Sequence, residues 1–265
     1  MLTAGQAFIE FWLVFFHALP VLLPLWLGAY LFSLLVLVFT FQWLKPRLKP
    51  GLVRLDDKVR ARALRWRYRD PVQAKRERVA LTWFFRFWTN FASAPALSCF
   101  AILLPMVAIA KMATQVQPGM IISGVPEFAF FRVGANTYIA PTLYFLPGLS
   151  YFGAMLLSFA KKRVFKRVRP PRPAGAFGHK MKDGSFPSGH SLTAICFWVM
   201  LGVVIGQSFG AAVGLAFLPL ALLIVACTGL SRIYMGVHYP SDVLGGYVIG
   251  LFWLVISYIA LYPAL

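Results

Sequence analysis

Long runs of apolar residues alternate with short polar segments along most of this chain. Several of these runs reach the roughly 20 residues that a helix needs to cross the hydrocarbon core of a bilayer. Because no water reaches the backbone there, each run must satisfy its own polar groups, which favours helices. The pattern therefore predicts an all-α integral membrane bundle that forms one domain over residues 1–265. About six transmembrane helices are expected, at residues 20–41, 91–113, 137–160, 188–207, 211–230 and 242–261.

The first apolar run, at residues 8–43, is too long for one straight crossing. Pro20 and Pro24 interrupt it, and proline removes a backbone donor and bends or ends a helix. We therefore expect residues 8–17 to form an interfacial or kinked lead-in to the first span.

The segment at residues 45–80, between the first two predicted spans, has a different pattern. Apolar residues follow helical spacing among arginines and lysines, at Leu52, Leu55, Val59, Ala63 and Trp66. This spacing is typical of a basic amphipathic helix that lies on the membrane surface. The alternative is a solvated, charged connector that binds no particular lipid.

Composition supports a membrane protein and makes the distribution of charge informative. Apolar residues make up 60% of the chain and charged residues 13%, compared with about 25% charged residues in soluble domains. The net charge of +18 is concentrated in residues 45–78 and 161–182, which the span count places on one face. Beside a membrane, such charge favours anionic lipids over nucleic acid as partners. Basic loops also tend to stay in the cytoplasm, which predicts a cytoplasmic orientation for this face.

Three short polar motifs stand at the ends of predicted spans. In the first, a continuing helix would place Lys162 and Arg169 two turns apart on one face, and Pro170 would end that helix. Lysine and arginine are also common at span ends, where they reach toward the head groups without any specific ligand.

The second motif, Pro187-Ser188-Gly189-His190, opens a predicted span. Ser188 suits a helix N-cap, and the first turn of a helix offers backbone N–H groups and a positive dipole to an anion. Gly189 lets the backbone approach a phosphate closely, and His190 follows in the same turn. The alternative is an ordinary capped helix with an incidental histidine at the interface.

The third motif joins Ser231 and Arg232 to His238 and Asp242. A carboxylate four residues after a histidine can accept a hydrogen bond from one imidazole nitrogen and aim the other nitrogen outward. That arrangement suits a nucleophilic or basic histidine, although an interfacial ion pair would explain it too. The span count brings all three motifs, at residues 162–242, to one face, and ionisable residues gathered there favour a functional site.

In these motifs the chain resembles the type-2 phosphatidic acid phosphatase superfamily. The signature of that superfamily is K-x6-R-P, P-S-G-H and S-R-x5-H-x3-D, and every position is present here in order. The resemblance implies that His238 is the nucleophile that forms a phospho-histidine, that Asp242 orients it, and that His190 protonates the leaving group and then activates water. It also implies a phosphate-binding set made of Lys162, Arg169, Ser188, Gly189 and Arg232. The family is metal-independent, so no metal and no other cofactor is expected.

The motifs and the membrane setting predict a phosphatase that acts on a lipid phosphomonoester or diphosphate. Candidate substrates are phosphatidic acid, phosphatidylglycerol phosphate, a polyprenyl diphosphate and a lipid A phosphate. A lipid phosphotransferase on the same scaffold and a non-catalytic transporter or lipid-binding protein remain alternatives. The expected location is a bacterial inner membrane. The well-known bacterial members of the family have outward-facing sites, against the orientation that the charges predict. The sequence leaves the oligomeric state open.

Overall fold

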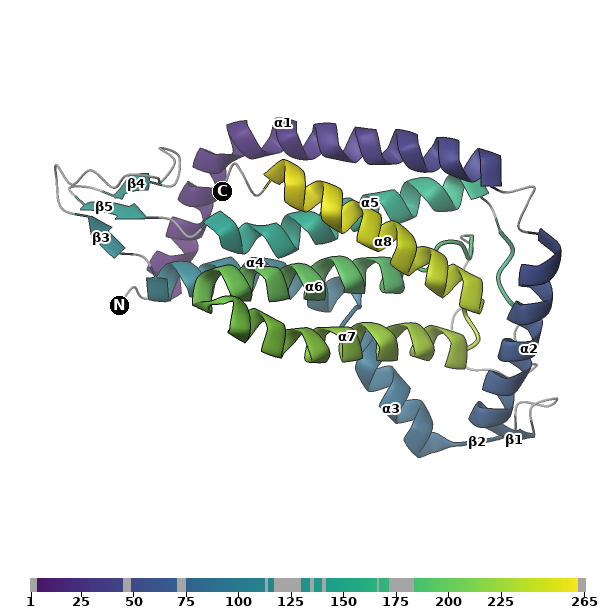
Figure 1. Ribbon diagram of the computed structural model, residues 1–265. Helices are drawn as coiled ribbons and strands as arrows, with labels where there is room; N and C mark the ends of the chain where they lie inside the picture. Colours follow the sequence, from purple (N-terminus) through teal and green to yellow (C-terminus); the bar gives the residue numbers. More distant parts are fainter. Residues whose placement is uncertain are drawn as a thin grey trace.

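The computed structural model describes residues 4–44, 49–70, 75–112, 114–116, 130–133, 136–139, 142–165, 167–171 and 184–261. Its helices are α1 (Ala4–Leu44), α2 (Lys49–Arg67), α3 (Val79–Asn90), α4 (Ala94–Met112), α5 (Leu146–Phe165), α6 (Gly189–Phe209), α7 (Ala211–Tyr234) and α8 (Pro240–Leu261). The long helices lie side by side in a bundle, with α2 and α3 at one end (Figure 1). The predicted all-α membrane bundle is therefore confirmed.

Length and composition identify the helices that can cross a membrane. Within the described residues, five stretches qualify, at Ala18–Thr40, Leu143–Ala160, Gly189–Phe209, Ala211–Tyr234 and Pro240–Leu261. α3 and the following part of α4 are apolar enough to qualify together, although they meet at a bend of 43°. If the two form one broken span, the number of crossings is six. The predicted number of about six spans agrees with this result.

The first helix is longer than the sequence suggested. α1 continues through Pro20 and Pro24, so the predicted lead-in is part of the helix rather than a separate segment. Figure 1 shows α1 changing direction between its first part and the part that lies along the bundle. The long part is held by Trp26, whose indole N–H donates to the Leu149 carbonyl at 2.9 Å and whose ring meets that of Trp253 edge-on.

Two small antiparallel sheets lie at opposite ends of the bundle (Figure 1). β1 (Tyr68–Asp70) pairs with β2 (Lys75–Glu77), and β5 (Asn136–Ile139) lies between β3 (Thr114–Val116) and β4 (Phe130–Val133). The prediction that the third span begins near residue 137 is therefore wrong. Thr137, Tyr138 and Ile139 favour extended backbone and pair as a strand, and the helix begins later, after a 3-10 turn at Thr142–Phe145.

The connector helix α2 packs against α7 and α8. Its C-terminal end is fixed by Arg67, which forms an ion pair with Glu77 at 2.7 Å and donates to the Met235 carbonyl at 3.0 Å. Leu55 and Trp66 on the same helix are more than half exposed. Contact with a lipid surface stays a prediction for these two side chains.

Glycine allows α6 and α8 to approach closely at the ends that carry the polar motifs. A Cβ atom on Gly246 would lie 2.7 Å from the Ser188 carbonyl oxygen, and one on Gly250 would lie 2.3 Å from the Ile195 Cγ2 atom. Within a bilayer, where apolar burial adds little between helices, such close backbone packing is a main source of helix association. The two helix N-termini are therefore held side by side.

Replacing Gly246 with alanine should destabilise the bundle, because the new methyl group meets backbone rather than a movable side chain. We expect a loss of about 1–3 kcal/mol, in the range of an overpacked core. Gly28→Ala is the matched control, since nothing lies within 4 Å of a Cβ atom there. Thermal unfolding of the two variants in detergent should show a lowered midpoint for Gly246→Ala only. Equal midpoints would mean that the close contact contributes no stability.

Candidate active site

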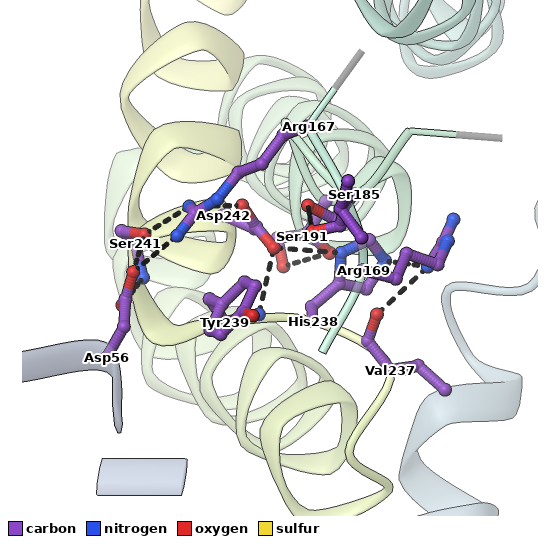
Figure 2. Close-up of polar contacts among 12 residues, drawn as sticks. Asp56, Arg167, Arg169, Ser185, Ser191, Val237, His238, Tyr239, Ser241 and Asp242 are labelled. Carbon is purple, nitrogen blue, oxygen red and sulfur yellow. Dashed lines mark hydrogen bonds and ion pairs between the residues drawn. The ribbon is translucent and has the colours of Figure 1, made fainter. Parts of the chain in front are cut away.

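The three polar motifs meet at the end of the bundle where α6 begins, α7 ends and α8 begins. Two segments outside the helices complete this end. The Ser185 N–H donates to the Arg167 carbonyl at 2.8 Å, which joins the segment after α5 to the segment before α6. This pairing brings Arg169 toward the loop that carries His238, as Figure 2 shows.

His238 and Asp242 form the centre of the site. Both side chains are buried, at 3% and 0% exposed. The Asp242 Oδ2 atom lies 3.6 Å from the His238 Nδ1 atom, slightly beyond hydrogen-bond length. Oδ2 also accepts a bond from the Tyr239 N–H at 2.8 Å. Among the described residues, Nδ1 has no hydrogen-bond partner, so Asp242 is its nearest polar neighbour and needs only a small shift to bond it.

The other imidazole nitrogen faces a cation. A terminal nitrogen of Arg169 lies 3.3 Å from His238 Nε2 and donates to the Val237 carbonyl at 3.0 Å. An arginine only donates, so this contact suits a neutral imidazole with its proton on Nδ1 and its lone pair on Nε2. Burial and, to a smaller extent, the charges of Arg232 and Arg169 lower the pKa of His238 to about 4, against the opposing effect of Asp242. His238 is therefore held unprotonated near neutral pH.

Arg232 approaches from the last turn of α7. Its side chain is buried and donates to the Thr89 hydroxyl of α3 at 3.2 Å. Its carbonyl accepts the Val237 N–H at 3.2 Å, which ties the His238 loop back onto α7. No pattern in the sequence indicated that α3 contacts this site.

The second motif lies where α6 begins. Ser188 has the extended backbone of an N-cap residue, but its side chain makes no capping bond. The predicted side-chain cap is therefore wrong. The Ser188 hydroxyl is buried and accepts a bond from the Ser191 hydroxyl at 2.9 Å instead. The Ser188 side chain therefore does not occupy the N–H groups of the first turn of α6.

Gly189 and His190 are the first two residues of α6. A Cβ atom on Gly189 would lie 3.0 Å from the Ser158 hydroxyl of α5, so a larger residue would press α6 away from α5. His190 is partly buried at this end of the bundle. Lys162 lies in the last turns of α5, and its side chain is outside the described residues.

Three residues that the sequence reasoning missed complete the polar network. They are Asp56 of α2, Arg167 and Ser241, which lie together beside Asp242 in Figure 2. Arg167 contacts both Asp56 and Asp242, at 2.7 and 2.8 Å. The one available signal was that Asp56 is among only eight acidic residues in the chain, and it stands in a strongly basic segment.

Comparison with known proteins agrees with this arrangement. Residues 143–264 match the family model of the PAP2 superfamily. The chain is 29% identical over 140 residues to phosphatidylglycerophosphatase B of Bacillus subtilis (strain 168), which covers 45% of this chain and 66% of that protein. It is 27% identical over 195 residues to lipid A 1-phosphatase of Rhizobium etli, and this aligned region covers 68% of this chain and 71% of that protein.

A solved structure shares the fold. The crystal structure of a transmembrane PAP2-type phosphatidylglycerolphosphate phosphatase from Bacillus subtilis superposes with a TM-score of 0.59 at 20% identity. The superposition covers 85% of this chain and 94% of that chain. The fold is thus that of a membrane-embedded PAP2 protein. The three motifs lie within the residues that match the family model of the PAP2 superfamily. The chain spans just under two thirds of the length of the Bacillus relative that it matches in sequence.

Proposed function

We propose that this protein is a phosphatase that hydrolyses a phosphomonoester or diphosphate on a membrane lipid. The observation that carries the proposal is the buried His238, with Asp242 on its Nδ1 side and Arg169 on its Nε2 side. In this arrangement the neutral Nε2 atom of His238 can attack a phosphorus atom, and the positive charge of Arg169 lies beside it. A phosphoryl group that enters between Nε2 and Arg169 would meet both.

The reaction follows from these positions. The lone pair of His238 Nε2 attacks phosphorus, an N–P bond forms and the bond from phosphorus to the lipid oxygen breaks. His190 gives its proton to the departing oxygen. Water then attacks the phospho-histidine while His190 takes the proton, and inorganic phosphate leaves with His238 restored. Asp242 stabilises the positive charge that the imidazole carries while it is phosphorylated.

The cations of the site supply electrostatic stabilisation. Charge builds on the equatorial oxygens of the transferring phosphoryl, and fixed donors that point at them lower the barrier. Lys162, Arg169 and Arg232 are the proposed cations, joined by Ser188 and the Gly189 N–H. In this proposal the side chains take the part that a metal ion takes in other phosphatases, so the reaction needs no cofactor.

A lipid substrate fits the position of the site. The His238 loop joins the ends of two spans, and the outer faces of the helices are rich in exposed leucine, valine and phenylalanine. A substrate can therefore keep its acyl or prenyl chains in the bilayer and present only its head group. The names of the two relatives, a phosphatidylglycerophosphatase and a lipid A 1-phosphatase, support a phosphorylated lipid.

The decisive experiment is phosphate release from a panel of lipid phosphates and diphosphates by detergent-purified protein. Release should persist with a chelator present and should fall about a thousandfold or more in His238→Ala, because the nucleophile is lost. His238→Ala must keep the thermal midpoint of the parent protein. If the chelator stops phosphate release, the proposal that the reaction needs no metal is wrong. If phosphate is transferred to an added lipid or sugar, the result favours the phosphotransferase.

The dependence of rate on pH should reflect a nucleophile that resists protonation. Burial lowers the pKa of His238 to about 4 from an ordinary value of 6.5. His238 thus stays neutral as the pH falls through 6.5 and becomes protonated, and inactive, only near 4. Since His190 must be protonated, the profile should also fall at high pH and be bell-shaped. A plot of kcat/KM against pH tests this, and an acid limb centred near 6.5 would contradict it.

We further propose that α2 lies on an anionic cytoplasmic surface of a bacterial inner membrane. The basic charge of residues 45–78 supports this orientation. In a Cys99→Ala background, Arg62→Cys on exposed α2 should react with an impermeant thiol reagent only after the cells are opened. Ala211→Cys, at the far end of the bundle, is the matched control and should react on intact cells. The reverse pattern would place the site outside.

A further inference from the structure

The connector helix α2 reaches the centre of the site through one carboxylate. Asp56 is 1% exposed, although it belongs to a basic helix whose next residue, Asp57, is exposed. Asp56 accepts three bonds, from the Ser241 N–H at 2.9 Å, from the Ser241 hydroxyl at 2.6 Å and from Arg167 at 2.7 Å. Bonds from a charged or backbone donor to a buried carboxylate are among the strongest in proteins.

Arg167 connects this carboxylate to the proposed catalytic pair. One of its terminal nitrogens faces Asp56, and the other donates to Asp242 Oδ1 at 2.8 Å. The guanidinium also lies over the Tyr239 ring, 4.3 Å from its centre. Partial burial lowers the pKa of Arg167, but the bonds and charges of Asp56 and Asp242 outweigh that effect and raise it. Arg167 is thus a permanent positive charge between two carboxylates.

The two oxygens of Asp242 are consequently assigned to different partners. Oδ1 is held by Arg167, whereas Oδ2 is held by the Tyr239 N–H and faces His238 Nδ1. The carboxyl group cannot rotate without losing both bonds. Since Arg167 has a long and flexible side chain, its own direction depends on Asp56, which anchors the far side of the guanidinium.

Asp56 also completes the start of α8. Pro240 is the first residue of α8, so Tyr239 stands at the N-cap and its side chain offers no acceptor for the first-turn N–H groups. The Asp56 carboxylate takes the Ser241 N–H in its place, at a helix end whose dipole favours negative charge. A carboxylate from one helix therefore caps another helix, and that second helix carries Asp242.

We propose that Asp56 is a positioning residue, which fixes Arg167 and the first turn of α8 so that Asp242 faces His238 Nδ1. The proposal rests on the proposed function, because its effect is read from phosphoryl transfer to His238. In this proposal α2 is a required part of the active site and not only a link between two spans. Arg60 of α2, which donates to the Pro171 carbonyl, fastens the same helix to the segment that carries Arg167 and Arg169.

The test measures phosphoenzyme formation in a single turnover, after mixing full-length protein in detergent with the best radiolabelled lipid phosphate from the panel. The rate constant reports how well His238 is positioned, and the amplitude reports the fraction of folded protein. Asp56→Asn keeps the shape but removes the charge that holds Arg167. We expect its rate constant to fall about 10- to 100-fold, as for other supporting partners of a reactive group, with amplitude and KM nearly unchanged. Asp57→Asn makes the same change one residue away on an exposed side chain and should match the parent.

Two further variants separate the possible outcomes. Asp56→Glu restores the charge and should recover part of the rate. Asp56→Asn combined with Arg167→Lys should be no slower than the slower single variant, because both changes break the same contact. A lost amplitude with an unchanged rate constant would show a purely structural role and overturn the proposal. A raised KM with an unchanged rate constant would make Arg167 a substrate ligand and overturn it as well. If the parent protein itself releases no phosphate, the proposed function fails and this inference fails with it.

Discussion

The contact between the first turns of α6 and α8 is the constraint on which the site depends. The Ser188 N–H donates to the Asp242 carbonyl at 2.9 Å, and Gly246 lets the two backbones meet beside that bond. Because each helix begins at this point, the first residues of α6 and of α8 come together from separate directions. The start of α6, where two of the proposed phosphate-binding residues lie, is thus held beside the start of α8, and no long loop is required to put it there.

Charge is distributed unevenly within this volume. Arg167 stands between Asp56 and Asp242 on one side of the site, so the two carboxylates and one guanidinium there balance to a single negative charge. The His238 side carries the guanidinium groups of Arg169 and Arg232, whose charges add to burial in lowering the pKa of the imidazole. A substrate that carries two negative charges would meet the positive side first, with the carboxylates screened behind His238. In the proposed reaction, this separation keeps Asp242 from repelling the incoming phosphate.

The sequence predicted the bundle and the motif residues because rare polar side chains are conspicuous in an apolar chain. It could not predict Asp56, since nothing in the spacing of residues 56, 167 and 241 indicates that they meet. The start of α5 was placed too early because Thr137, Tyr138 and Ile139 are apolar enough for a span, while their β-propensity is expressed only when β3 and β4 are beside them. The prediction that the Ser188 side chain caps α6 was also wrong. Ser188 correctly marks the start of the helix, but the sequence does not reveal that its hydroxyl pairs with that of Ser191 instead.

The cap that α2 provides for α8 has a consequence for biosynthesis. Asp56 is translated long before Ser241, its hydrogen-bond donor at the start of α8. Until α8 has been synthesised, the carboxylate has neither that donor nor Asp242 opposite it, whereas Arg167, its ion-pair partner, is already part of the chain. The nascent chain therefore carries an incomplete site through every earlier stage of insertion. Under the proposed function, the site is complete only when α8 has joined the other helices, so reactivity would begin only after that step.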